Sequence, residues 1–149
     1  MARRVFFSFH YERDVWRVNV VRNSGAIEGV SAAGFHDSSL WEEAKRHGDD
    51  AVKKLIDSGL HASTVTVVLI GAETASRKYV SYEVEQSVAR GNGILGIRIN
   101  NIKDMNGRID PPGQIPVALA KTGAPIYTWE YGKLGEWVES AYKHAREKA

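Results

Sequence analysis

The sequence predicts an α/β fold, in which a mainly parallel sheet of about five strands is covered by helices on both faces. Segments typical of strands alternate along the chain with segments of helical periodicity, and this alternation is typical of parallel sheets. The run Val65–Ile70 is apolar on both faces, as expected for a central strand buried between two layers of helices. With 149 residues and no internal repeat, the chain is expected to form a single domain over residues 1–149.

Each element is predicted from local composition or spacing. The first strand, over residues 4–9, is rich in aromatic and branched side chains, and Val15, Val18 and Val21 then recur at helical spacing. Further strands are expected over 26–30, 65–70, 94–99 and 126–129, and helices over 12–22, 41–58, 77–90 and 134–146. The proline-containing segment 100–125 predicts a long loop with one short helix. Five such strands fit a doubly wound, flavodoxin-like sheet, in which ligands bind beyond the carboxyl ends of the strands.

Composition excludes several classes of protein. The chain has no cysteine, which removes disulfide frameworks, thiolate metal sites and cysteine nucleophiles and favours a reducing cytoplasm. The formal net charge of +2 is too small for the clustered basic footprint of a nucleic-acid-binding protein. The longest apolar run, 65–71, is far shorter than the ~20 residues that span a membrane, and the apolar stretch near the N-terminus is too short for a signal peptide.

Four possible functional sites were weighed against the sequence, and each lacks residues or context that it needs. Gly91–Gly96 has the spacing of a dinucleotide fingerprint, but a helix precedes it and a strand follows, the reverse of what the fingerprint requires. The five histidines show no metal-ligand spacing, so no metal site is predicted. A phospho-acceptor receiver would use Glu12 and Asp14 with an aspartate ending the central strand, where Gly71 stands instead. A flavin site would need a phosphate-binding loop of Ser, Thr and Gly after the first strand, and none is recognisable there.

The segment 76–84 is the most informative in the chain. It follows the central strand and opens a helix, on which Tyr79 and Glu83 are four residues apart and share one face. A ring and a carboxylate are thus expected to point together toward the strand ends. The ordinary alternative is a core tyrosine beside a solvated surface glutamate. Arg77 and Lys78 could likewise meet a pyrophosphate near the helix N-terminus or be simply solvated.

Two segments together resemble the Toll/interleukin-1 receptor (TIR) domain family. Residues 4–10 resemble the opening strand of TIR domains, which commonly reads apolar, apolar, Ser, aromatic. Residues 74–84 resemble the TIR pattern Ser-x-Trp-Cys-x-x-Glu-Leu, with Tyr79 at the Trp and Glu83 at the Glu. With the flanking strands, the chain looks like the TIR-like family that includes the ThsB proteins of the bacterial Thoeris anti-phage system. The resemblance covers most of residues 4–102, whereas the segment 22–40 departs from it.

The resemblance implies an NAD⁺ nucleosidase or ADP-ribosyl cyclase that cleaves the nicotinamide–ribose bond and makes a cyclic ADP-ribose-type signal. Glu83 stands at the position of the family's catalytic glutamate. One carboxylate suffices chemically, because nicotinamide leaves as a neutral molecule and needs no general acid, unlike the leaving group in glycoside hydrolysis. NAD⁺ is then the substrate, and no cofactor is expected.

The resemblance also places the substrate-binding residues. Tyr79 is expected to stack on a ring of the dinucleotide, and Arg77 to meet its pyrophosphate. The opposite wall is expected from the end of the first strand, at Phe7, Ser8, Phe9 and His10. Asp37 and Ser38 lie on the next loop and are further candidates.

The alternative is a non-enzymatic module for protein–protein interaction and assembly. Many TIR domains act as scaffolds, and some of the four tryptophans could be exposed interface anchors. A pure scaffold has no need of Glu83, which separates the two hypotheses.

The resemblance implies two kinds of partner besides NAD⁺, namely a second copy of the chain and a downstream effector activated through a nucleotide signal. No nucleic acid or membrane partner is expected.

Overall fold

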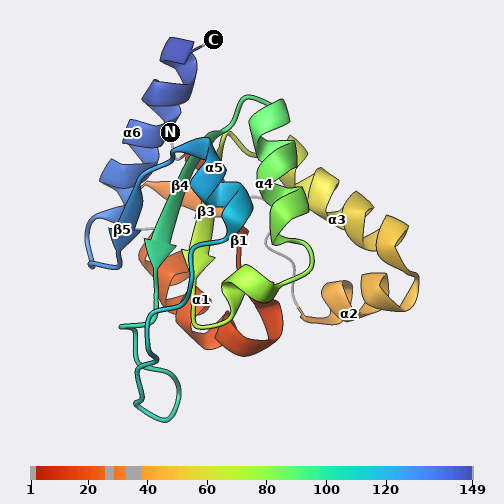
Figure 1. Ribbon diagram of the computed structural model, residues 1–149, viewed down its shortest axis with the longest axis vertical. Helices are drawn as coiled ribbons and strands as arrows, with labels where there is room; N and C mark the ends of the chain where they lie inside the picture. Colours follow the sequence, from red (N-terminus) through yellow and green to blue (C-terminus); the bar gives the residue numbers. More distant parts are fainter. Residues whose placement is uncertain (1–2, 26–28, 33–37, 149) are drawn as a thin grey trace.

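A five-stranded parallel sheet forms the centre of the computed structural model, which describes residues 3–25, 29–32 and 38–148 (Figure 1). The strand order is β2-β1-β3-β4-β5, and every neighbouring pair is parallel. The strands are β1 (Arg3–Ser8), β2 (Val30–Ala32), β3 (Val65–Ile70), β4 (Gly93–Arg98) and β5 (Ile126–Thr128). This order is that of a doubly wound, flavodoxin-like sheet, and it confirms the predicted fold class. The strand expected over 26–30 starts at Val30 instead, and residues 26–28 lie outside the described residues.

Helices cover both faces of the sheet. On one face, α1 (Tyr11–Gly25) and α6 (Leu134–Lys148) pack against alternate residues of β1, β3 and β4. On the other face lie α3 (Asp49–His61), α4 (Val80–Ala89) and the short α5 (Val117–Thr122). All six residues of β3 are buried, because both of its faces and both of its edges are covered. Among the described helices, none is long and apolar enough to cross a membrane.

The predicted helix over 41–58 is wrong as a single element. The chain forms α2 (Ser38–Arg46) and then α3, with a turn at Gly48 between them. Gly48 has φ 97°, a left-handed conformation that glycine adopts without the steric cost other residues meet. This break turns Asp49 away from the axis of α2 and places it at the start of α3, beside the functional pocket described below.

The predicted helix over 77–90 also starts later than expected. A 3₁₀ turn, η1 (Thr74–Ser76), follows β3, and α4 begins only at Val80. Between them Arg77 has an extended backbone with φ −71° and ψ 131°. Tyr79 therefore immediately precedes the helix, and its carbonyl accepts the Glu83 backbone N–H at 2.9 Å.

A buried arginine on α1 fixes the long loop after β4. The Arg17 Nε donates to the carbonyl of Ile102 at 2.7 Å, and its Nη2 donates to the carbonyl of Arg108 at 3.0 Å. Its Nη1 forms an ion pair with Asp110 at 2.9 Å. This loop projects beyond the carboxyl end of the sheet (Figure 1), and it carries the short helix α5 that the prolines predicted.

Two glycines of β4 allow different neighbours to approach closely. A Cβ on Gly93 would lie 2.5 Å from the Ala141 carbonyl oxygen in α6, whereas one on Gly96 would meet the Ile126 and Leu119 side-chain ends at 2.7 and 2.9 Å.

We expect Gly93→Ala to lower the free energy of unfolding by about 1–3 kcal/mol, because the α6 backbone must move. Gly96→Ala should cost less, because methyl groups can rotate aside. Urea denaturation of both variants compares the two costs, and an equal or reversed order would contradict this packing.

Candidate functional site

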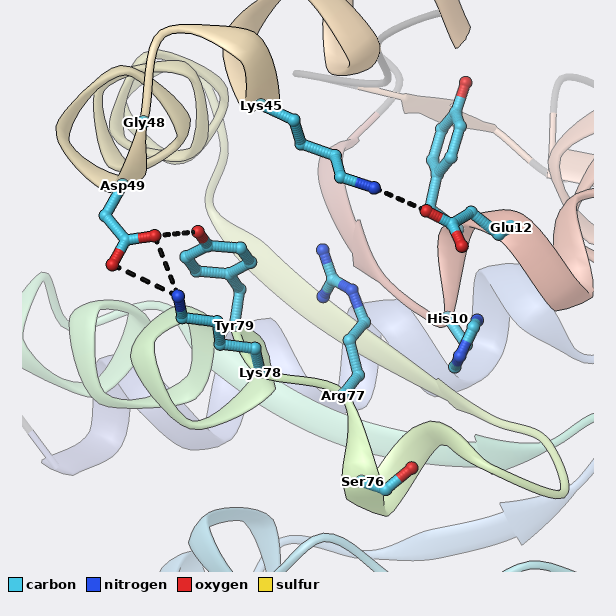
Figure 2. A pocket seen from close by; sticks show the side chains of 10 residues that line it. His10, Glu12, Lys45, Gly48, Asp49, Ser76, Arg77, Lys78 and Tyr79 are labelled. Carbon is cyan, nitrogen blue, oxygen red and sulfur yellow. Dashed lines mark hydrogen bonds and ion pairs between the residues drawn. The ribbon is translucent and has the colours of Figure 1, made fainter.

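A pocket opens beyond the carboxyl end of β1, where the strand order reverses between β1 and β3. Ligands of doubly wound sheets bind at such a switch point. The pocket has a volume of about 390 Å³, within the range of small-molecule sites. Three segments meet there, namely the start of α1, the junction of α2 and α3, and the residues between β3 and α4 (Figure 2). Its lining residues are His10, Tyr11, Glu12, Lys45, Gly48, Asp49, Ser76, Arg77, Lys78 and Tyr79.

Glu83 lies behind this pocket in the first turn of α4, only 2% exposed. The Ser8 hydroxyl, at the end of β1, donates to Glu83 Oε1 at 2.6 Å. The Arg77 guanidinium forms an ion pair with the same oxygen. A buried carboxylate is stable only when charge and hydrogen bonds compensate it, and these two donors supply both. The structure thus brings together Ser8, Arg77 and Glu83 from three separate segments.

Alternation along β1 decides which of its side chains reach the site. Phe6 and Ser8 face α3 and α4, whereas Phe7 packs on the opposite face in the core cluster of α1 and α6. Phe9 belongs to that same cluster and stacks on Tyr11 with ring centroids 5.6 Å apart. The side chains of Phe7 and Phe9 are therefore core residues and do not line the pocket, and the reason is the two-residue period of a strand.

The remaining predicted binding residues fall in three places. His10 lines the pocket, and its Nδ1 accepts the Arg13 backbone N–H at 3.2 Å. Asp37 lies outside the described residues. Ser38 is the first residue of α2, and its side chain is outside the description. Arg77 and Tyr79 both line the pocket.

Tyr79 is held in place through its hydroxyl group. It donates to Asp49 Oδ1 at 2.5 Å, and Lys78 Nζ donates to the two oxygens of Asp49 at 2.9 and 3.1 Å (Figure 2). Burial and the Asp49 hydrogen bond both raise the pKa of Tyr79. The hydrogen bond from Tyr79, followed by that from Lys78, lowers the pKa of Asp49. The tyrosine therefore presents a neutral ring, fixed in orientation, to the pocket.

A second charged pair crosses the pocket between α2 and α1. Lys45 Nζ donates to Glu12 Oε1 at 2.5 Å (Figure 2). This hydrogen bond lowers the pKa of Glu12 and raises that of Lys45, so both stay charged at neutral pH. The pocket wall is thus built from paired cations and anions.

Asp14, in the first turns of α1, is a further buried carboxylate near this edge of the sheet. It is fully buried, and both of its oxygens lack a hydrogen-bond partner among the described residues. A Cβ on Gly71 would lie 2.2 Å from Asp14 Oδ2, so the carboxylate packs directly against the backbone at the end of β3. The nearest guanidinium nitrogen of Arg17 is 3.7 Å away. Burial raises the pKa of Asp14 in spite of that cation.

Comparison with known proteins identifies the family. The family described as "Thoeris protein ThsB, TIR-like domain" matches residues 6–104. A protein of Bacillus cereus (strain MSX-D12), provisionally named cyclic ADP-D-ribose synthase ThsB1, is 45% identical over 150 residues, which cover 95% of this chain and 78% of that protein. This chain belongs to the ThsB TIR-like family. The match confirms the family resemblance, and it includes the second half of β1 together with β3, η1 and α4, and so Ser8, Arg77 and Glu83.

Three charged residues of this ThsB-family pocket were not identified from the sequence. Lys45 and Asp49 were placed on one continuous helix, where charged residues are ordinarily solvated. Only the turn at Gly48 brings both of them to the pocket. Glu12 was considered solely as a metal ligand of a receiver, whereas it pairs with Lys45. The glycine at 48, four residues before the apolar periodicity of α3 begins at Val52, is the one sequence signal of the break.

The raised pKa of Asp14 predicts a pH-dependent stability. The folded protein keeps the proton over a range in which the unfolded chain, with a pKa of about 3.9, has lost it. The retained proton adds to the free energy of unfolding. This contribution is complete below the pKa that Asp14 has in the unfolded chain, and it is lost as pH rises through the pKa that Asp14 has in the folded protein. Asp14→Asn has no such proton, so its stability relative to wild type should increase with pH over that window. Denaturant unfolding measured from about pH 4 to pH 8 tests this, with the exposed Asp50→Asn as control. Parallel profiles for wild type and Asp14→Asn would refute it.

Proposed function

We propose that this chain cleaves the nicotinamide–ribose bond of NAD⁺ and closes the ADP-ribosyl product into a cyclic signal, in bacterial defence against phage. The observation that carries the proposal is the buried Glu83 carboxylate, held by Ser8 behind a pocket at the switch point of the sheet. The synthase name of the Bacillus cereus relative and the Thoeris family support the same reaction class.

The proposed chemistry needs one well-placed anion. The bond from the ribose anomeric carbon to the pyridinium nitrogen breaks, and its electron pair stays on nicotinamide, which leaves neutral. Positive charge then develops on the ribose ring, and the Glu83 carboxylate stabilises it. This stabilisation is strong because the group is oriented in advance and little water surrounds it. Ser8 orients the carboxylate through its 2.6 Å hydrogen bond. NAD⁺ is the substrate in this proposal, and no further cofactor takes part in the step.

The nucleophile that captures the ribosyl group decides the product. Attack by water gives ADP-ribose, whereas attack by an adenine nitrogen or a ribose hydroxyl of the same molecule gives a cyclic product. In each case the new bond forms at the anomeric carbon. A water or ribose hydroxyl acceptor then loses its proton to water, whereas a ring nitrogen of adenine attacks with its lone pair and the adenine takes up the positive charge. The acceptor must stand within about 3–3.5 Å of that carbon. Tyr79 supports the cyclic product, because its fixed ring offers a surface on which a base of the folded dinucleotide can stack.

An assembly module is the second candidate function. Trp16 is 49% exposed on α1, and Val20, one turn further, is 38% exposed. Such a pair suits a contact with another protein, including a second copy of the chain. Trp129 and Trp137 pack against the core and do not favour this alternative. Self-association is also compatible with the enzyme, so the two candidates are separated by Glu83.

Substitution of Glu83 tests the enzymatic proposal. We expect Glu83→Gln to reduce nicotinamide release from NAD⁺ by about 10²–10³-fold or more, because the amide cannot stabilise a developing positive charge. Glu85→Gln is the matched control, since Glu85 is an exposed glutamate of the same helix. Chromatography with mass detection measures nicotinamide, ADP-ribose and any product lighter than ADP-ribose by one water. Thermal unfolding shows that both variants fold. Equal nicotinamide release by wild type and Glu83→Gln would contradict the proposal, and no release by any variant would favour the assembly module.

A further inference from the structure

Arg77 separates the pocket from the carboxylate that the proposed reaction needs. Glu83 does not line the pocket and is 2% exposed, whereas Arg77 does line it. The Arg77 side chain reaches between Tyr79 and the Lys45–Glu12 pair (Figure 2), and its guanidinium is paired with Glu83. Only 9% of that side chain is exposed. A ribose that enters the pocket therefore meets Arg77 before it meets Glu83.

Removing Arg77 from Glu83 is unfavourable unless both charges find new partners. A buried carboxylate that loses its cation is left uncompensated, which is strongly destabilising. NAD⁺ carries both replacements. Its diphosphate is an anion that can take the guanidinium, and its ribosyl-nicotinamide end is a cation that can face the carboxylate. A bound NAD⁺ molecule can thus replace the Arg77–Glu83 ion pair with two new ones, between Arg77 and the diphosphate and between Glu83 and the ribosyl-nicotinamide cation.

The position of Arg77 suits such an exchange. Its extended backbone joins two helical segments, η1 and α4, and is fixed there, because its N–H donates to the Thr74 carbonyl at 3.1 Å and its carbonyl accepts the Val80 N–H at 3.4 Å. The exchange therefore needs only a movement of the side chain. The two lysines that line the pocket are already paired with pocket carboxylates, Lys45 with Glu12 and Lys78 with Asp49. A guanidinium also binds a diphosphate through two parallel hydrogen bonds, which an ammonium group cannot match.

We propose that Arg77 determines specificity by passing from Glu83 to the diphosphate of the incoming dinucleotide, so that Glu83 is uncovered only when a diphosphate is bound. The inference rests on the proposed cleavage of NAD⁺ and narrows its substrate class to nicotinamide dinucleotides. Nicotinamide riboside contains the same scissile bond but no phosphate. It cannot draw Arg77 away, and it is a poor substrate for that reason.

Binding of ADP tests the exchange without any turnover. In wild type, ADP must compete with Glu83 for Arg77, whereas in Glu83→Gln that competing charge is gone. We expect Glu83→Gln to bind ADP at least fivefold tighter than wild type and Arg77→Gln to bind it at least tenfold weaker, by isothermal titration calorimetry. Adenosine, which has no diphosphate, should bind equally to wild type and Glu83→Gln. Arg90→Gln, at the far end of α4, is the control for loss of an arginine.

Turnover gives the second measurement. Wild type should cleave NAD⁺ with a kcat/KM at least 100-fold above that for nicotinamide riboside, and Arg77→Gln should reduce this ratio at least tenfold. Arg77→Lys, which keeps the charge but loses the forked geometry, should fall between them and guards against misfolding of Arg77→Gln. The proposal is overturned if Glu83→Gln binds ADP no tighter than wild type, or if Arg77→Gln keeps the wild-type ratio. Failure of wild type to cleave NAD⁺ would instead refute the proposed function, and the ADP titrations would still decide the exchange.

Discussion

The complete burial of β3 is the constraint on which the rest of the structure depends. A strand with six buried residues and a partner on each edge needs a layer of helices on both faces. The chain meets this requirement by winding outward in both directions from β1 and β3, so the connections on the two sides diverge at the carboxyl edge. The pocket lies at that divergence, with walls from the residues after β1 and the residues after β3. The location of the site is thus a consequence of how the central strand is covered.

Charge compensation at this edge shapes the chemistry that the pocket can support. In and next to the pocket, three carboxylates face cations across short distances, in the pairs Glu83 with Arg77, Asp49 with Lys78, and Glu12 with Lys45. The last two pairs are partly exposed and contribute little to stability, but they fix side-chain directions. The first pair is buried, where each charge depends on the other. A zwitterionic ligand such as NAD⁺ is matched to a site of this kind, because it can enter without leaving an unpaired charge behind.

The sequence predicted most of the fold for identifiable reasons, and it singled out Glu83, whose catalytic role stays a prediction. β3 has a composition that fits only a buried strand, and Glu83 stands in a motif whose order and spacing resemble a known family. The errors come from geometry that composition does not encode. Phe7 and Phe9 were assigned to the pocket because they are near the end of β1, although alternation sends them to the opposite face. The position of Asp49 depends on the positive φ of Gly48, and this glycine is the one sequence signal of a turn in a segment with a helical pattern on both sides.

Two carboxylates near this edge of the sheet, Glu83 and Asp14, are deeply buried, and the structure accommodates their burial in different ways. Glu83 receives a hydroxyl and a guanidinium, so its environment supplies compensating donors. Asp14 packs against Gly71, neither of its oxygens has a hydrogen-bond partner in the part of the chain that the structure describes, and burial raises its pKa. Because burial raises its pKa, Asp14 holds a proton more readily than an ordinary carboxyl group, and it is less suited than Glu83 to stabilise positive charge. A carboxylate kept with exchangeable donors can do so as soon as a ligand replaces one of them. Compensation rather than burial therefore distinguishes Glu83 from Asp14, and it is the reason why we propose Glu83 as the reactive carboxylate.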